Sequence, residues 1–452
     1  MLFRSSSSGE ESIGITGLSG GGFAVTWHSE TASGSEVYGR LYNASGTALT
    51  GEILLNTSTL NWQWLPQVTQ LSDGGFLVTW VSQNQENVSS GYSLYGQRFD
   101  AYGNKLGNEF MVNTTWANEQ GSPATLTDRL HDVVGLAGGG WVAAWYDSAL
   151  DGSGGGIYMQ RFDANGAKLG AETRVNTVTA NDQLHVSLAA LADGGFTVAW
   201  DSYGQDVGST WGVYQKVYEA NGLERVNDGF VSADILTNTT TTGNQLAPKS
   251  AGLANGGHIE VWVSNQLNSS SNYDYEVYAQ LYDASGKKVG SEIMVNTYTT
   301  EKQGMINANT LTPYLDVVGL SNGEAVVTWA SWNQPNDNNA FGIFAQRLTV
   351  SNGLTKQGSE FQVNTYTSAW QVAPQATSLS DGGFLIAWAS DGKDGSFWGV
   401  SAQRYNSAGT AQGGEIVLNA TTSGSQGSSS YNDEGLSVAG LTGGGFAATW
   451  EY

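Results

Sequence analysis

The chain repeats one pattern of apolar and polar positions, and its clearest copy is the stretch Phe76–Trp80. In an extended strand Phe76, Val78 and Trp80 share one face, and the two residues between them share the other. Apolar residues on both faces predict a strand that is covered on both sides. The two glycines before Phe76 predict a tight turn, because glycine reaches positive φ without steric cost.

This stretch occurs eight times, at intervals of about 60 residues, which predicts a repeat architecture. A large aromatic residue at the end of each copy is typical of a core anchor between packed sheets. We therefore interpret these tryptophans as core residues and not as a ring of sugar-stacking sites. They are Trp27, Trp80, Trp145, Trp200, Trp262, Trp329, Trp388 and Trp450.

Each unit contains four predicted strands. The first precedes the double glycine, and the second is the repeated stretch itself. The third carries an aromatic-x-Gln-Arg-aromatic pattern, as in Tyr95–Phe99, and the fourth ends in Val-Asn-Thr, as in Val112–Thr114. A turn such as Asp163–Gly166 joins the third strand to the fourth, with good turn residues at both ends. A longer crossover then leads to the next unit.

Three short links and one crossover per unit predict an all-β fold, a β-propeller of four-stranded antiparallel blades. An open solenoid of stacked sheets is the alternative. The first two strands occur eight times and the last two seven times, which favours eight blades over seven. In the eight-bladed arrangement the last blade is incomplete, or residues near Leu2–Arg4 complete it. The chain, 1–452, is then one domain with approximate units 12–65, 66–123, 124–185, 186–247, 248–313, 314–373, 374–435 and a partial 436–452.

The formal net charge of −23 restricts the partners that we expect for this protein. Such a surface repels nucleic-acid phosphate and anionic lipid, so we expect neither nucleic-acid binding nor membrane insertion. There is no cysteine, which excludes disulfides and thiolate chemistry. No apolar run approaches the ~20 residues of a membrane span. Met1–Glu11 lacks the apolar core of a signal peptide, so we expect a fragment or an export signal elsewhere.

Acidic residues in the loops between the second and third strands are candidate metal ligands. Calcium prefers carboxylate and carbonyl oxygens on a flexible loop. Each of three loops offers two carboxylates, which is fewer than the calcium-binding loop of an EF-hand provides. The competing interpretation is that these aspartates cap turns. The predicted calcium ligands are Asp147, Asp151, Asp201, Asp206, Asp391 and Asp394.

Tryptophans outside the repeated stretch are candidate glycan-stacking residues, because they lie in loops with Asn, Gln and Asp nearby. They equally resemble lids over the ends of blades. The candidates are Trp211, Trp398, Trp332, Trp116 and Trp370.

Two recurrent polar residues have structural interpretations. A Gln seven residues after the Asn, as at Gln183, recurs in every crossover, where its amide would satisfy backbone groups. The Arg of the third strand, as at Arg98, is replaced by apolar residues such as Val217, which indicates that its stem packs on a neighbour. A cationic ring for an acidic glycan is the alternative for the arginines.

Signals for catalysis are weak. The four histidines, His28, His131, His185 and His258, fall in different units without a metal-ligand spacing. No Gly-x-Ser-x-Gly elbow is present. Two carboxylates from different blades could meet in the channel, as in glycoside hydrolysis, but the sequence does not place them.

The repeat consensus Asp-Gly-Gly-Phe-x-Val-x-Trp, followed by Val-Tyr-x-Gln-Arg-Phe-Asp-Ala-x-Gly and Glu-x-x-Val-Asn-Thr, resembles repeats of large secreted bacterial proteins of the hemolysin-type and adhesin-like kind. The resemblance covers nearly the whole chain and implies a secreted or cell-surface location. It names no activity. The nonapeptide calcium array of such proteins is absent, so the resemblance assigns no calcium ligand.

We therefore expect an extracellular, non-enzymatic binding or structural module whose loops face a glycan, a cell-surface polymer or other copies of the chain. A matrix or filament subunit is one form of this hypothesis. The alternative is a glycan-active enzyme, a glycosidase or lyase, with carboxylates in the propeller channel. Calcium is the one cofactor that we expect.

Overall fold

The protein is described by a computed structural model that is almost entirely β-structure. The part of the chain that it describes comprises residues 10–31, 34–86, 91–116, 119–121, 130–206, 210–225, 233–268, 274–307, 312–335, 340–395, 397–419, 426 and 435–451. Within these residues no helix is long and apolar enough to cross a membrane.

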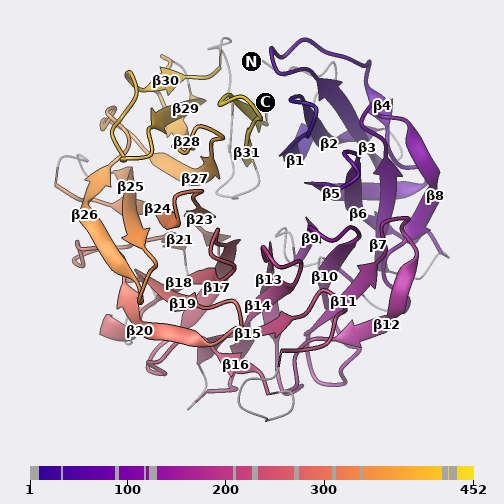
Figure 1. Cartoon of the computed structure of the whole chain (residues 1–452), viewed down its shortest axis with the longest axis horizontal. Coiled ribbons are helices and arrows are strands. Elements are labelled where there is room, and N and C mark those ends of the chain that lie inside the picture. The colour runs from indigo at the N-terminus through magenta and orange to yellow at the C-terminus, as the bar shows by residue number, and fades with distance from the viewer. Residues whose placement is uncertain are drawn as a thin grey trace.

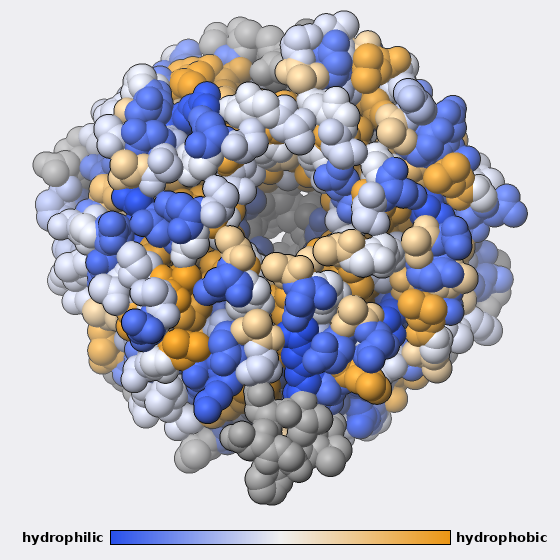
Figure 2. Space-filling view, viewed as in Figure 1, coloured by the Kyte–Doolittle hydropathy of each residue, from blue (hydrophilic) through white to orange (hydrophobic). Residues whose placement is uncertain are grey.

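Antiparallel sheets stand around a central opening, as the blades of a propeller do (Figures 1 and 2). In each blade the first strand is innermost and the fourth lies at the rim, and successive strands pair with each other. The all-β propeller of four-stranded antiparallel blades is thereby confirmed. We number the blades in chain order.

Seven blades have four strands each. Blade one contains β1 (Glu10–Gly17), β2 (Phe23–Thr31), β3 (Gly34–Tyr42) and β4 (Ile53–Leu54), and blade two contains β5 (Asn61–Gln70), β6 (Phe76–Gln83), β7 (Tyr92–Phe99) and β8 (Lys105–Met111). Blade three contains β9 (His131–Gly135), β10 (Trp141–Asp147), β11 (Gly156–Phe162) and β12 (Lys168–Arg174), blade four contains β13 (Gln183–Ala190), β14 (Phe196–Tyr203), β15 (Trp211–Tyr218) and β16 (Ile235–Leu236), and blade five contains β17 (Gln245–Gly252), β18 (His258–Ser264), β19 (Glu276–Tyr282) and β20 (Lys288–Met294). Blade six contains β23 (Leu315–Gly319), β24 (Glu324–Trp332), β25 (Phe341–Thr349) and β26 (Thr355–Gln362), and blade seven contains β27 (Gln371–Ser378), β28 (Phe384–Asp391), β29 (Trp398–Tyr405) and β30 (Ile416–Val417).

Three smaller elements complete the fold. A short hairpin of β21 (Met305–Asn307) and β22 (Thr312–Pro313) precedes blade six, and a single 3₁₀ turn, η1 (Gln266–Asn268), follows β18. The last sheet contains only β31 (Leu436–Gly440) and β32 (Phe446–Trp450).

The core lies between blades, where the repeated tryptophans pack. All eight are at most 5% exposed, so their interpretation as core residues is confirmed. Trp80 of blade two belongs to a cluster with Val37 and Leu41 of blade one, and the other blades repeat this arrangement. Burying such a ring is worth several kcal/mol, which makes this layer the main source of cohesion between blades.

The two-stranded sheet lies in the ring between blades seven and one (Figure 1). A Cβ on Gly440 of β31 would lie 2.0 Å from the Ser378 carbonyl oxygen of β27, and one on Gly17 of β1 would lie 2.7 Å from the Gly440 oxygen. Glycine permits this close backbone approach on both sides. The predicted pairing of Leu2–Arg4 with this sheet lies outside the described residues, and the number of blades, eight or seven, stays a prediction.

Most inner strands contain a β-bulge near their start. The residue two positions after the crossover glutamine has positive φ at Leu65, His185, Ala247 and Ala373, and the strand register shifts there. The inner strands therefore begin before the unit boundaries that we placed after residues 65, 185, 247 and 373. The bulge interrupts the alternation of side chains, and this made the first half of each strand resemble a loop.

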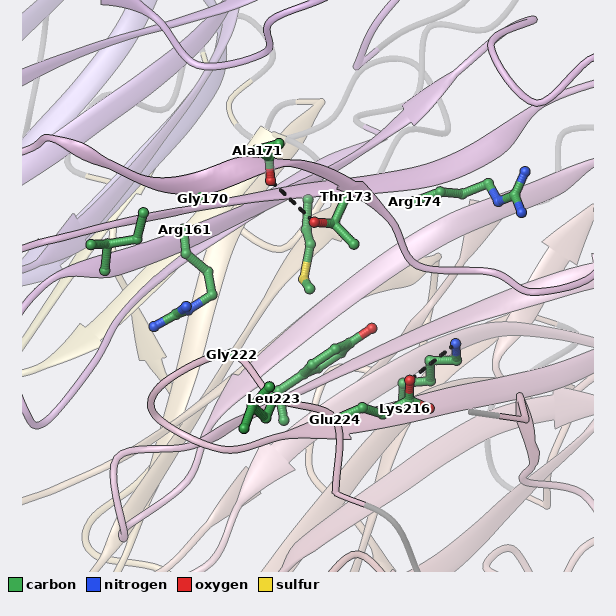
Figure 3. Close-up of a pocket in the computed structure, with 12 residues that line it drawn as sticks. Arg161, Gly170, Ala171, Thr173, Arg174, Lys216, Gly222, Leu223 and Glu224 are labelled. Carbon is green, nitrogen blue, oxygen red and sulfur yellow. Dashed lines mark hydrogen bonds and ion pairs between the residues drawn. The ribbon is translucent and has the colours of Figure 1, made fainter. Parts of the chain in front are cut away.

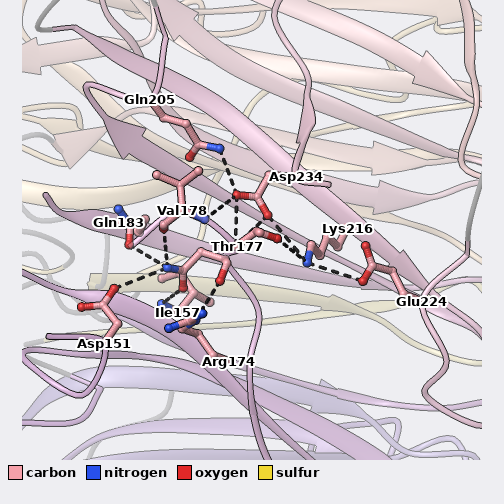
Figure 4. A network of polar contacts seen from close by, with 11 residues as sticks. Asp151, Ile157, Arg174, Thr177, Val178, Gln183, Gln205, Lys216, Glu224 and Asp234 are labelled. Atoms are coloured by element: carbon pink, nitrogen blue, oxygen red, sulfur yellow. Dashed lines mark hydrogen bonds and ion pairs between the residues drawn. The ribbon is translucent and has the colours of Figure 1, made fainter. Parts of the chain in front are cut away.

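A polar contact joins each four-stranded blade to the next at the rim. A Glu or Asp in the fourth strand, or directly before it, accepts the backbone N–H of the Thr that follows the terminal Asn of the preceding blade. Figure 4 shows the version in blade four, where Asp234 accepts the Thr177 N–H at 2.8 Å and lies 3.6 Å from Lys216 Nζ. The pairs are Thr57 with Glu109, Thr114 with Glu172, Thr177 with Asp234, Thr239 with Glu292, Thr297 with Glu360 and Thr365 with Glu415.

The recurrent Gln and Arg have the structural roles that we predicted. The Gln183 amide donates to the Ala180 carbonyl and accepts from Asn176, inside the crossover. Arg347 donates to the carbonyls of Ser407 and Ala408, in the turn between the third and fourth strands of the next blade. Arg161 binds the turn carbonyls of the next blade in the same way, whereas Arg98 and Arg404 pair with an aspartate of their own blade.

Candidate functional site

One face of the ring carries the crossovers and the loops between second and third strands; we call it the loop face. The opposite face carries the tight turns, and we call it the turn face. All of the predicted metal and glycan residues lie at the loop face, because they lie at the loops between second and third strands or, for Trp116 and Trp370, in crossovers. The structure allows each of them to be placed by its contacts.

Three of the predicted calcium ligands share one structural role. Asp151, Asp206 and Asp394 accept hydrogen bonds from the side-chain amide of the Asn that ends the fourth strand, at 3.5, 3.3 and 2.5 Å. Each carboxylate lies over a glycine at the start of the third strand, such as Gly156, whose missing Cβ leaves room for it. In blades one and five a Glu occupies that glycine position and reaches the same Asn itself.

The other three predicted ligands have separate surroundings. Asp147 is fully buried and accepts from Gln120 Nε2 at 2.8 Å and from two backbone amides of its own turn. Burial raises its pKa, against the opposing effect of those hydrogen bonds. Asp201 belongs to a pair described below, and Asp391 begins a tight turn. The described residues contain no group of three or more acidic or histidine side chains suited to a metal ion, and calcium stays a prediction.

Four of the five predicted glycan tryptophans pack against other side chains. Trp332 and Trp370 meet edge to face with ring centroids 5.8 Å apart, and Trp398 packs on the same cluster. Trp211 stands beside Tyr203 at 5.3 Å and is partly buried. Trp116 is the most open of them, with 45% of its surface exposed. No contact of these rings tests the stacking prediction.

The most unusual polar contact at this face is between His185 and Asp201 of blade four. Nδ1 of His185 lies 2.7 Å from Oδ2 of Asp201, which is fully buried and also accepts the Ala247 N–H of blade five at 2.9 Å. The His185 side chain is 10% exposed. A buried carboxylate that holds one ring nitrogen fixes the tautomer and the orientation of the imidazole, as an acid–base group requires.

Tyr146 of blade three adjoins this pair through a small apolar cluster. The cluster contains Tyr146, Leu130 and Leu184, and Trp211 packs against it. Leu184 is the residue of β13 that pairs with Asp201 of β14, which places the cluster beside the His185 and Asp201 pair. Burial, and then the charges of four nearby carboxylates, raise the pKa of Tyr146 to about 12, so the phenol stays protonated. Those carboxylates are Asp182, Glu119, Asp147 and Asp151.

Our sequence analysis named Asp201 and Trp211 but missed Tyr146, and treated His185 only as a scattered histidine. Alignment of the repeats by their tryptophans would have provided a signal. The position of His185 is Leu65 in blade two and Ala373 in blade seven, and the position of Asp201 is Val81 and Ala389 there. In blade four a polar pair therefore replaces an apolar pair, and such a difference between repeats could have indicated a functional position.

Two cavities lie away from this region. One, of about 350 Å³, opens at the rim between β12 and β15 and is lined by Arg161, Arg174 and Lys216 (Figure 3). The fourth strand of blade four, β16, is only two residues long. The other, of about 340 Å³, lies where β1, β27 and β31 meet, and no carboxylate lines it.

Two carboxylates of inner strands link one blade to the next. Asp132 of β9 accepts the Leu188 N–H of the next blade, and Asp316 of β23 accepts the Ala376 N–H in the same way, both at 2.8 Å. Burial raises the pKa of Asp316. The prediction that an enzymatic site would use two carboxylates of the channel stays a prediction.

No protein-family model matches the chain, and no curated protein does. Similar folds exist among solved structures. The polysaccharide lyase Uly1 is 11% identical, with a TM-score of 0.49 over 86% of this chain and 88% of that one. An ulvan lyase is 10% identical with a TM-score of 0.49, over 82% and 88%. An α-L-arabinanase of Penicillium chrysogenum is 12% identical with a TM-score of 0.41, over 71% and 89%.

These neighbours contradict two of our predictions. We expected a non-enzymatic module and no enzyme, whereas the similar structures named above are all enzymes that act on carbohydrates. Both predictions are corrected on that finding. Our reasoning went wrong because it sought sequence motifs of catalysis, which a site assembled from loops of different blades does not contain. At identities of 10 to 12% no activity passes from these proteins to this chain.

Proposed function

We propose that the protein is a glycan-active enzyme whose acid–base group is His185, at the loop face of blades three and four. The observation that carries the proposal is the 2.7 Å contact between His185 Nδ1 and the buried Asp201. In this role Asp201 is a positioning residue. It holds Nδ1, which leaves Nε2 to exchange a proton with substrate; Nε2 is buried in this structure, so substrate reaches it only when neighbouring side chains move.

The surroundings of the pair suit a sugar chain. Trp211 and Tyr203 present two aromatic rings beside the cluster, and the apolar face of a sugar ring packs on such surfaces. Tyr146, protonated at neutral pH, supplies a hydrogen-bond donor next to them. The net charge of −23 disfavours a strongly acidic polymer, so we propose a neutral glycan as substrate. An extracellular location, which the repeat resemblance implied, fits a substrate of this kind.

The test is a panel of neutral polysaccharides incubated with the protein, with release of new reducing ends as the readout. We expect activity on at least one polymer and a fall of about 10²–10⁴-fold in His185→Gln. Asp201→Asn should lower kcat and change the pH–rate profile, because it alters the tautomer of the imidazole without removing it. Acidic polysaccharides, followed by the ultraviolet absorbance of an unsaturated product, form the comparison set.

Leu65→Ala is the matched control, since it changes the same bulge position in blade two, far from the proposed site. It should leave the rate unchanged. Full activity in His185→Gln, or no activity on any polymer, contradicts the proposal.

We also propose that β31 and β32 are the inner half of an eighth blade. Their strand pairing matches the first two strands of the other blades, and both flanks contact neighbouring blades.

A further inference from the structure

The rim cavity between β12 and β15 gathers basic side chains in a strongly acidic chain. The chain has 18 basic residues against 41 acidic ones, and three of the basic residues, Arg161, Arg174 and Lys216, line this cavity. Glu224 is the one acidic residue among the twelve that line it, all of which the structure describes. The cavity is therefore a local basic region on a molecule whose net charge is −23.

Arg161 lacks the carboxylate that its counterparts in other blades have. In blade two the equivalent Arg98 pairs with Asp73 at 2.9 Å. Blade three has Gly138 at that position, four residues before the strand residue that pairs with the arginine. Burial lowers the pKa of Arg161, and no carboxylate of the described residues offsets this effect. The other pairs are Arg347 with Glu324 and Arg404 with Asp381.

Arg161 is held in place and still has N–H groups to donate. Its two terminal nitrogens donate to the carbonyls of Asn221 and Ala220, in the turn that follows β15. These bonds use two of the five N–H donors of the guanidinium, and Nε has no acceptor within the described part of the chain. A fixed guanidinium at the wall of a cavity suits the oxygens of a carboxylate or a sulfate.

The other two basic residues differ from each other. Lys216 is 4% exposed, and its Nζ lies 3.5 Å from Glu224 and 3.6 Å from Asp234, so its charge is balanced. Arg174 is exposed and donates to the Asn176 carbonyl, and among the described residues it forms no ion pair. The excess positive charge of the cavity is therefore that of the two arginines of blade three.

The cavity also has apolar walls. Met159 and Tyr218 line it as buried side chains, and Leu169 and Leu223 line it with 41% and 67% of their surfaces exposed. The apolar C–H face of a sugar ring can cover exposed leucines, whereas a bare inorganic anion would leave them in water. In Figure 3 Arg161 and Lys216 lie on opposite sides of the space between these walls. The lining thus suits a ligand that combines a ring with an acidic group.

We propose that this cavity binds one acidic sugar residue, a uronate or a sulfated sugar, of a largely neutral glycan. The acidic group accepts hydrogen bonds from Arg161, the ring packs against Leu169 and Leu223, and a hydroxyl donates to Glu224. The cavity lies at the rim, whereas the proposed catalytic pair lies at the loop face. This is therefore an accessory binding site, and it does not depend on the proposed enzymatic function.

The experiment is a calorimetric titration of the full chain, at low ionic strength, with glucuronate, glucose 6-sulfate, glucose and inorganic sulfate. We expect one-to-one binding of at least one of the two acidic sugars. Glucose and inorganic sulfate should each bind at least about tenfold more weakly, since each lacks one half of the recognition. Added salt should weaken the binding of the acidic sugar. The proposal is overturned if neither acidic sugar binds, if glucose binds equally well, or if sulfate does, which would indicate an adventitious ion only.

Gly138→Asp tests the role of Arg161 without removing it. A Cβ at Gly138 meets no other atom within 4 Å, so the substitution has room, and it restores the carboxylate that blade two has. The new carboxylate competes for Arg161, and we expect about tenfold weaker binding of the acidic sugar. Arg161→Gln should weaken binding at least as much.

Gly20→Asp in blade one is the matched control. Gly20 occupies the same position before its second strand, has the same open surroundings, and lies in a blade with Leu41 in place of the arginine. The two variants change the net charge equally, so Gly20→Asp should leave the affinity unchanged. Equal weakening by Gly20→Asp and Gly138→Asp would overturn the assignment of the site to Arg161. Binding is measured here without catalysis, so failure of this proposal and failure of the proposed function are distinguishable.

Discussion

Blades two and four have the same strand order and the same buried tryptophan, but they differ around that shared frame. Blade two has apolar Leu65 and Val81 where blade four has His185 and Asp201. Its rim strand, β8, has seven residues, against two in β16. The contacts that all blades share explain how the ring holds together. The contacts found in one blade alone are where we look for function.

The largest effect on stability should come from removing the buried tryptophan that both blades share, and this effect should be equal in blades two and four. We expect Trp80→Ala and Trp200→Ala each to lower the free energy of unfolding by about 3–5 kcal/mol, because each leaves a large cavity between two blades. Denaturant unfolding measures both. A much smaller loss in blade four would mean that its departures have also changed the core layer.

The interface between blades four and five contains a second departure, His258 and Glu260, where blade two has Phe76 and Val78. His258 Nε2 lies 2.7 Å from the Gln215 oxygen, and Glu260 accepts from Ser250 at 2.6 Å. We expect the double variant His258→Phe with Glu260→Val to be more stable by about 1 kcal/mol or more, since packed apolar residues often replace a buried polar pair favourably. Thermal unfolding at pH 7 is the measurement.

This pair also predicts how stability depends on pH. Burial raises the Glu260 pKa from 4.5 to about 8, so the folded state keeps a proton that the unfolded chain loses, and stability falls as pH rises through that window. Burial lowers the His258 pKa from 6.5 to about 3, which makes stability rise with pH up to 6.5. Between pH 6.5 and 8 only the fall remains, at up to about 1.4 kcal/mol per pH unit from this residue. In Glu260→Gln that slope should be reduced.

A smaller effect should come from the rim contacts. Glu109→Gln should cost about 1 kcal/mol, because it weakens the charged hydrogen bonds that Glu109 accepts from the Thr57 N–H and from Gln85 Nε2. Asp234→Asn should cost more, since Asp234 accepts the equivalent bonds from Thr177 and Gln205 and also lies near Lys216. Added salt should reduce the difference between the two variants. Equal losses would show that the contact of Asp234 with Lys216 contributes nothing.

Calcium should have the smallest effect. Asp151, Asp206 and Asp394 already accept hydrogen bonds from Asn amides, so an ion has to compete with them. If the predicted sites bind, stability should rise by about 0.4 kcal/mol per site when the calcium concentration equals Kd. Asp394→Asn should remove the stabilisation that the predicted calcium site of blade seven contributes. Calorimetry that detects no calcium binding contradicts the prediction.

The features that repeat were predictable from the sequence, because each copy confirms the others. The alternation around Trp80, the double glycines and the crossover Gln183 led to the strands, the turns and the propeller. The start of the inner strands was not predictable, since the bulge at Leu65 breaks the alternation that reveals a strand.

Features that occur once were harder to predict. The pairing of His185 with Asp201 depends on a bulge that turns one side chain toward the neighbouring strand, and the strand pattern does not record that. A non-enzymatic module was the wrong conclusion because we looked for sequence motifs of catalysis and treated His185 only as one of four scattered histidines.

The central claim is that the departures in blade four carry the function. The most direct test restores the pattern of blade two there, with His185→Leu and Asp201→Val, and measures glycan cleavage beside thermal unfolding. The account predicts a folded protein with a melting temperature at or above that of the wild type and a loss of cleavage of at least about 10²-fold. A restored blade that cleaves glycan at the wild-type rate would contradict it.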